Sequence, residues 1–135
     1  NKLKDALAAY EKASVVDPNS AYAWDTLGWA YLAGGDYQRA SVVFKNATEA
    51  DPNYLPAHGH LGLAYYKMRN YEDAIISYKR AFELGDTTLE YYYETGLSYA
   101  FLDRCAEARP WCLEAIEIDE TAWPAWDCLD LCPEE

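Results

Sequence analysis

The four cysteines are the residues of this chain with the richest possible chemistry, and they all lie in its final third, at Cys105, Cys112, Cys128 and Cys132. On one regular helix, Cys105 and Cys112 would be two turns and about 10 Å apart, too far to bridge each other. Cys128 and Cys132 would be one turn apart and could supply half of a tetrahedral metal site, with the other half on the preceding helix. The missing Cys-x-x-Cys spacing weakens the case for a metal site. Cys112 stands at a core aromatic position and Cys132 at a core alanine position, so we expect small, reduced core cysteines; one inter-helix disulfide near the C-terminal cap and a metal site are the alternatives.

The two histidines, His58 and His60, do not form a shared metal site on a regular helix. Two positions apart, their side chains diverge by about 200° around the helix axis. We expect His58 in the core. The sequence also has no nucleophile with a base at a recognisable spacing, no glycine-rich phosphate loop and no paired carboxylates in a predicted cleft. We therefore expect neither an enzyme nor a bound cofactor.

A strong acidic balance restricts the partners. The 135 residues include 23 acidic and 11 basic side chains, which gives a formal net charge of −12 and a pI near 4.4. This charge disfavours nucleic-acid phosphates and anionic membrane surfaces, and favours a basic partner. No apolar run approaches the roughly 20 residues of a membrane-spanning helix. The sequence thus predicts binding to neither nucleic acid nor membrane.

The elements that position these residues recur along the chain, because the sequence repeats itself with a period of 34 residues. No insertion breaks the register. Units of this length bury a core only against their neighbours, so the repeat predicts an all-α solenoid in which about three units are needed for stability. The recurring small and aromatic positions are Ala6, Ala40, Ala74 and Ala108; Ala13, Ala47, Ala81 and Ala115; Gly28, Gly62 and Gly96; and Tyr31, Tyr65 and Tyr99.

Turn residues set the predicted helix boundaries. Apolar spacing predicts helices over residues 21–33 and 37–50, with Gly34-Gly35-Asp36 between them to end the first helix and cap the second. The Asp17-Pro18 and Asp51-Pro52 pairs stop helices because proline lacks the amide proton. We expect one domain over residues 1–135: the second helix of a truncated repeat at 1–20, repeats at 21–54, 55–88 and 89–122, and a C-terminal capping helix at 123–135.

Three positions depart from the repeated pattern. His58 stands where the neighbouring repeats have a larger ring. Gly85 replaces the Asp-Pro stop and can end a helix through a positive backbone angle. Pro110 lies well inside the predicted second helix of the third repeat, and it should kink that helix or delay its start. The changes at His58 and Gly85 do not threaten the predicted fold.

The repeated pattern consists of Trp24, Leu27, Gly28 and Tyr31, followed by Ala40, Phe44 and Pro52. This pattern resembles the tetratricopeptide repeat (TPR), and the resemblance covers nearly the whole chain. It implies a right-handed superhelical solenoid of antiparallel helix pairs that serves as a non-enzymatic scaffold for protein–protein interaction. In this family the first helix of each pair lines a concave groove, which usually holds a peptide or helix of a partner protein.

The groove that the resemblance implies would be aromatic and acidic in this chain. Rings give contact area at a low entropic cost and can face cations, so we expect a protein segment with apolar anchors beside Lys or Arg. A competing interpretation is that Tyr66 and Leu97 are partly buried between repeats. The candidate binding residues are Tyr22, Asp25, Trp29, His60, Tyr66, Glu90, Tyr93, Glu94, Leu97 and Phe101.

Some TPR proteins bind the acidic C-termini of chaperones through Lys, Asn and Arg, which pair with carboxylates. The matching positions here are Asp25, Trp29, His60, Glu90 and Glu94, three of which are carboxylates. We therefore predict no binding to chaperone tails. Two other functions are open: a spacer that self-associates through an exposed apolar N-terminal edge, or a redox- or metal-responsive cysteine cluster near the C-terminus.

Overall fold

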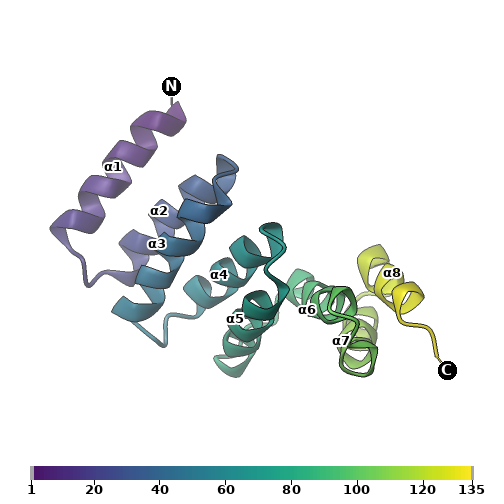
Figure 1. Ribbon diagram of the computed structural model, residues 1–135. Coiled ribbons are helices and arrows are strands. Elements are labelled where there is room, and N and C mark those ends of the chain that lie inside the picture. The colour runs from purple at the N-terminus through teal and green to yellow at the C-terminus, as the bar shows by residue number, and fades with distance from the viewer. Residues whose placement is uncertain (1, 135) are drawn as a thin grey trace.

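The computed structural model describes residues 2–134, and over this range the chain forms eight helices and no strand. The predicted core positions Ala6 and Ala13 lie outside the described side chains. Successive helices pack in antiparallel pairs that follow one another from α1 in purple to α8 in yellow, so the two termini lie at opposite ends of the stack (Figure 1). The helices are α1 (Lys2–Val16), α2 (Ala21–Ala33), α3 (Tyr37–Ala50), α4 (Leu55–Lys67), α5 (Tyr71–Glu83), α6 (Leu89–Phe101), α7 (Cys105–Ile118) and α8 (Trp123–Leu131).

We call α2, α4, α6 and α8 the A helices, and α3, α5 and α7 the B helices. The A helices α2, α4 and α6 each pack against the B helix that follows and against the next A helix along the stack, and α8 packs against α6 and α7. The predicted core positions Ala40, Ala74 and Ala108 on the B helices are fully buried, as are Phe44 and Tyr78. No helix within residues 2–134 is both long enough and apolar enough to span a bilayer.

The turns inside the helix pairs share one backbone conformation. Gly35, Arg69 and Asp103 have φ angles of 80°, 60° and 59°, and they are equivalent positions of the repeat. A left-handed conformation costs an L-residue roughly 1 kcal/mol, so the packing of the helix pairs holds Arg69 and Asp103 there. Asp36 follows the first of these turns and accepts a hydrogen bond from the Arg39 amide at 3.1 Å, which confirms the predicted helix cap.

The helix boundaries agree closely with those predicted from the turn residues. The helices α2 and α3 cover the predicted ranges, and α1 ends directly before Asp17-Pro18. Gly85 follows α5 with a φ of 103°, the positive angle expected of a helix stop. The alternative of a delayed start for α7 is wrong, because this helix begins at Cys105 and continues through Pro110.

A ring on the A helix secures the preceding loop in two of the repeats and in the C-terminal helix α8. The Trp24 indole N–H donates to the Pro18 carbonyl at 2.8 Å, and Trp126 makes the same bond to the carbonyl six residues before it, at 2.9 Å. His58 occupies the equivalent position, with Nε2 at 2.8 Å from the Pro52 carbonyl. Because a carbonyl only accepts, Nε2 of His58 carries the hydrogen. The half-buried His58 thus replaces a tryptophan both as a ring and as a donor.

His58→Phe should lower the free energy of unfolding by about 1 kcal/mol, because the ring remains while the Pro52 carbonyl loses its donor. His58→Trp is the matched control, since its indole N–H can restore the bond that the other repeats make. Urea unfolding followed by far-UV circular dichroism measures both variants. Equal losses in the two would show that the ring nitrogen does not stabilise this loop.

Candidate partner-binding face

The predicted binding residues all lie on A helices, but the structure buries them to different extents. We call this set of side chains the A-helix face. An exposed ring or carboxylate can contact a partner directly, whereas a buried one acts through its neighbours. Exposed members are Tyr22 (71%), Trp29 (49%), Phe101 (49%) and Glu90; half-buried members are His60, Tyr66 and Tyr93; and buried members are Asp25, Glu94 and Leu97.

Asp25 and His60 form a pair that joins α2 to α4. The Asp25 carboxylate oxygen Oδ1 lies 2.7 Å from Nδ1 of His60. A carboxylate only accepts, so Nδ1 carries the hydrogen and the imidazole is held in one orientation. The Trp29 ring lies beside His60, with the centroids 4.9 Å apart. No hydroxyl or thiol in the described residues is bonded to His60, so the pair lacks the nucleophile that acid–base catalysis of acyl transfer requires.

The charge of Asp25 acts on two tyrosines, Tyr54 and Tyr91. Burial raises the pKa of Tyr54, and the charges of Asp25 and Tyr22 add to this effect. Burial also raises the pKa of Tyr91, with the carboxylates of Asp86, Glu94 and Asp25 contributing in that order. The hydroxyls of Tyr54 and Tyr91 therefore stay protonated, and the surface around Asp25 is rich in neutral donors.

Glu94 is bonded inside the stack. Its carboxylate accepts a hydrogen bond from the Tyr78 hydroxyl on α5, and both side chains are buried. Burial raises the pKa of Glu94, although the Tyr78 bond and the Lys67 charge act in the opposite direction. Burial and the Glu94 charge also raise the pKa of Tyr78, which keeps its hydroxyl a donor. Glu94 thus ties α6 to α5 and presents little carboxylate surface to solvent.

Three aromatic rings, one each from α4, α5 and α6, form a chain of ring contacts. The Tyr66 and Tyr71 centroids are 5.9 Å apart, and those of Tyr71 and Phe101 are 4.9 Å apart. Burial raises the pKa of Tyr66 to about 12, so this hydroxyl is neutral at physiological pH. The chain ends at the half-exposed Phe101 ring, which makes it a continuous apolar surface that reaches solvent.

The contact between each B helix and the next A helix repeats along the stack with three different chemistries. In every case the two residues are 16 positions apart. We call these pairs the junction contacts: Phe44 with His60, whose ring centroids are 5.4 Å apart, Tyr78 with Glu94, joined by a hydrogen bond, and Cys112 with Cys128, joined by a disulfide. The junctions therefore change from ring packing to a hydrogen bond to a covalent bond towards the C-terminus.

The four cysteines form two disulfides, Cys105–Cys132 and Cys112–Cys128, which join α7 to α8. The predicted reduced state is therefore wrong, and the alternative of a single disulfide is incomplete. Burial of Cys112 and Cys132 is confirmed, since both are 0% exposed. Spacing along one helix correctly excluded a bridge between Cys105 and Cys112. It contained no information on how α8 lies against α7, which brings the paired Cα atoms to 5.1 and 6.2 Å.

The same pairing contradicts the cysteine metal site. All four sulfur atoms are used in disulfides, whereas a metal site of this type needs free thiolates. Across residues 2–134, no group of three or more His, Cys, Asp or Glu side chains is placed to hold a metal ion.

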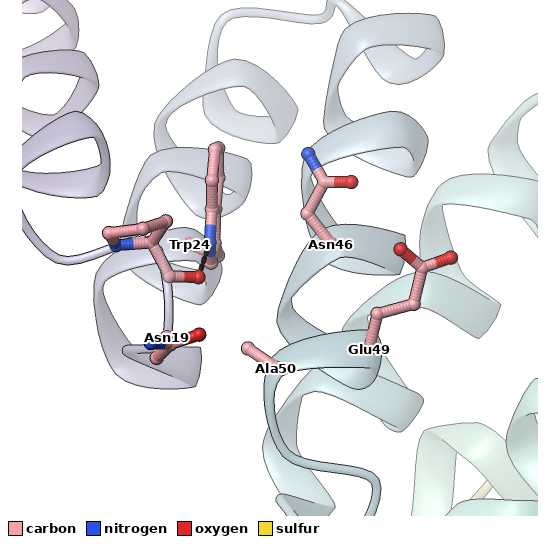
Figure 2. Close-up of a pocket in the computed structure, with 6 residues that line it drawn as sticks. Asn19, Trp24, Asn46, Glu49 and Ala50 are labelled. Carbon is pink, nitrogen blue, oxygen red and sulfur yellow. Dashed lines mark hydrogen bonds between the residues drawn. The ribbon is translucent and has the colours of Figure 1, made fainter.

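A pocket of about 340 Å³ opens between the start of α2 and the end of α3. Trp24 and Asn19 stand on one side of it and Asn46, Glu49 and Ala50 on the other (Figure 2). Glu49 is the one titratable side chain of its lining, so the pocket holds no acid–base pair. Three further pockets, of about 250 to 380 Å³, also lie outside the A-helix face.

Tyr91 is a structural residue of this face that the sequence prediction missed. Its ring covers Gly59 of α4, where an added Cβ would lie 2.5 Å from the ring, and it stacks on Tyr78 with centroids 4.9 Å apart. The equivalent positions of the preceding repeats are Ala23 and Ala57. A tyrosine in register with alanines could have identified Tyr91, together with the glycine that leaves room for it.

Comparison with known structures shows strong likeness in fold. The match to MamA has a TM-score of 0.88 and 25% identity and covers 96% of this chain and 76% of that chain. The match to YrrB, described as a TPR protein with an unusual peptide-binding site, has a TM-score of 0.79 and 21% identity and covers 92% and 66%. The match to TTC0263, a thermophilic TPR protein of Thermus thermophilus, has a TM-score of 0.69 and 23% identity and covers 96% and 72%. The chain thus spans about two thirds to three quarters of these proteins.

Comparison of the sequence with protein families finds matches over most of the chain. Residues 1–81 match the family described as anaphase-promoting complex, cyclosome, subunit 3, and residues 60–122 match the tetratricopeptide repeat. No curated protein matches the chain. The 34-residue period, the all-α solenoid and these matches agree with one another. The chain belongs to the tetratricopeptide repeat family.

Proposed function

We propose that the A-helix face binds a peptide or helix of a partner protein that carries both apolar and basic residues. TPR chains are protein–protein interaction modules, and this chain is one of them. The exposure of Tyr22, Trp29 and Phe101 carries the proposal, because rings left open on a binding surface are typical anchors of an interface. The peptide-binding site described for YrrB, which has a similar fold, supports the same use.

The uneven distribution of charge along the chain favours one orientation of the proposed ligand on the A-helix face. Residues 1–80 carry nine acidic and nine basic side chains, whereas residues 81–135 carry fourteen acidic and two basic ones. Both of these last basic residues, Arg104 and Arg109, are already in ion pairs 2.7 Å long. We therefore expect the basic part of the ligand over α6, near the exposed Glu90, and the apolar part over the rings of α2.

Fluorescence anisotropy with labelled peptides tests this proposal. The probe has tryptophan and leucine in one half and lysines in the other, and its controls are the reversed order, a glutamate-for-lysine version and a peptide ending in Glu-Glu-Val-Asp. The probe should bind best and weaken as salt is added. Trp29→Ala should weaken it about tenfold, since a half-exposed indole is a typical hot spot.

Val42→Ala is the matched control variant, because Val42 is 55% exposed but lies on the B helix α3. Its affinity should remain that of the unsubstituted protein. Equal losses in the Trp29 and Val42 variants, or tighter binding of the Glu-Glu-Val-Asp peptide than of the basic probe, would contradict the proposal.

Self-association is the second candidate function, and it rests on a different surface. Val15 and Val16 at the end of α1 are 77% and 82% exposed, and Tyr10 is 36% exposed. In this second function, residues 1–135 would form a spacer domain that associates with further copies of itself. Light scattering over a range of protein concentrations distinguishes the two functions. A molecular mass that rises with concentration, but not in a Val15→Glu variant, supports self-association, and a constant mass excludes it.

A further inference from the structure

The two disulfides between α7 and α8 have different surroundings. The inner disulfide, Cys112–Cys128, has both residues fully buried, and it lies against α6: an added Cβ at Gly96 would come within 2.1 Å of the Cys112 sulfur. In the outer disulfide, Cys105–Cys132, Cys105 is half-buried and lines a pocket of about 360 Å³. A thiol from solution can therefore approach a sulfur of the outer bond, while the closed stack covers the inner one.

An arginine lies beside the outer disulfide in the same pocket. The Arg109 guanidinium donates to the Cys132 carbonyl at 2.5 Å and to the Glu134 carboxylate at 2.7 Å. Glu134 is 84% exposed, so water screens its carboxylate more than the Arg109 guanidinium, which is 22% exposed. The remaining positive charge next to Cys132 favours its thiolate, and a thiolate that is more stable leaves faster in thiol–disulfide exchange. The surroundings thus make Cys105 the accessible point of attack and Cys132 the leaving group.

The helix α8 has few other anchors. Its buried side chains are Ala125 and Cys128, whereas Trp123, Trp126 and Leu131 are 76%, 43% and 53% exposed. Small buried side chains remove little apolar area from water, so they contribute little to the docking of α8. Leu129 of α8 also packs, partly buried, against the neighbouring core, and the two covalent bonds add an anchor at the middle of the helix and one at its C-terminal end.

We propose that the outer disulfide is a thiol–disulfide exchange site that a dithiol reductant opens while the inner disulfide stays closed. A thiolate of the reductant attacks Sγ of Cys105, the bond to Cys132 breaks, and the Cys132 thiolate takes up a proton. The second thiol of the reductant then displaces Cys105, so that the dithiol becomes a disulfide and the outer bond becomes two thiols. This step frees the end of α8 and does not depend on the proposed peptide binding.

Titration with dithiothreitol under native conditions tests the order of opening. The reaction is quenched with N-ethylmaleimide, and peptide mapping by mass spectrometry assigns the labels. Labels on Cys105 and Cys132 should appear at least about tenfold faster than labels on Cys112 and Cys128, because the inner bond needs a further opening of the stack. Simultaneous labelling of all four cysteines, or none before denaturant is added, would overturn the proposal.

Two arginine variants test the surroundings of the outer bond. Arg109→Gln should slow the labelling of Cys105 and Cys132 by about threefold, because the leaving thiolate loses its neighbouring cation. Arg104→Gln is the matched control, since Arg104 precedes α7 and pairs with Glu107 at 2.7 Å. Its labelling rate should be unchanged. Equal rates in the two variants would overturn the role of Arg109 as a positioning residue for this exchange.

Discussion

Gly96→Ala should lower the free energy of unfolding of the oxidised protein by about 3 kcal/mol, at the upper end of what one added methyl group does to a packed core. The new Cβ would lie 2.1 Å from the Cys112 sulfur, 3.2 Å from the Cys128 sulfur and 3.3 Å from the Ala108 carbonyl oxygen. A flexible side chain could rotate away from it. The inner disulfide is fixed on two helices, so the helices themselves must separate. Urea unfolding followed by circular dichroism measures the loss.

A double-mutant cycle isolates the sulfur contact. In a Cys112→Ala/Cys128→Ala background, Gly96→Ala should cost less than about 1 kcal/mol, because the space of the sulfurs is empty and alanine favours a helix over glycine by about that amount. The same loss in both backgrounds would show that the inner disulfide is not what excludes a side chain at Gly96.

Tyr78→Phe should destabilise the protein by about 2 kcal/mol at neutral pH, because the buried Glu94 carboxylate loses the hydroxyl that donates to it. The ring and its packing remain, so the change measures the hydrogen bond. Glu94→Gln is the matched variant: it removes the buried charge, while its amide oxygen can still accept from Tyr78. Its free energy of unfolding should equal or exceed that of the unsubstituted protein.

The effect of Tyr78→Phe should depend on pH. Burial raises the pKa of Glu94 in the folded state, so the folded protein binds this proton more tightly than the unfolded chain does. The protonated form thus adds stability at low pH, and this contribution is lost as pH rises through the folded-state pKa. The deficit of Tyr78→Phe should therefore shrink as pH falls from neutral through the folded-state pKa of Glu94. A deficit that does not change as pH falls would contradict a charged Glu94 at neutral pH.

The helices and their order could be predicted from the sequence because their signals are local. Gly35 and the Asp17-Pro18 stop each act within a few residues of the helix boundary that they set, and the 34-residue period repeats such boundaries along the chain. Chemical contacts between helices could not be predicted in the same way. The bond from Asp25 to His60 crosses 35 positions, and the spacing of one helix does not show which residue of the next helix it will meet.

The candidate site shows the same limit. The sequence treated Asp25 and Glu94 as carboxylates open to a ligand, since acidic side chains on helices are usually solvated. In the structure both carboxylates are buried, and each is hydrogen-bonded to a side chain of another helix, Asp25 to His60 and Glu94 to Tyr78. The role of Asp25 and Glu94 in ligand binding stays a prediction. Substitution of the exposed Tyr22 and Trp29 is the more direct test of binding to the A-helix face.

The two disulfides also determine how the molecule would respond to a pulling force. Among the described residues, no disulfide links the helices α1 to α6 to one another, so under tension they can be drawn out pair by pair. Cys105 and Cys132 are 27 residues apart, and the segment between them stays short as long as their bond is closed. The closed inner bond still holds the 16 positions between Cys112 and Cys128, so opening of the outer bond alone releases 11 of the 27 positions, about 37 Å of chain length at roughly 3.4 Å per residue. Reduction of the outer disulfide would therefore turn a stretch of fixed length into an extensible one.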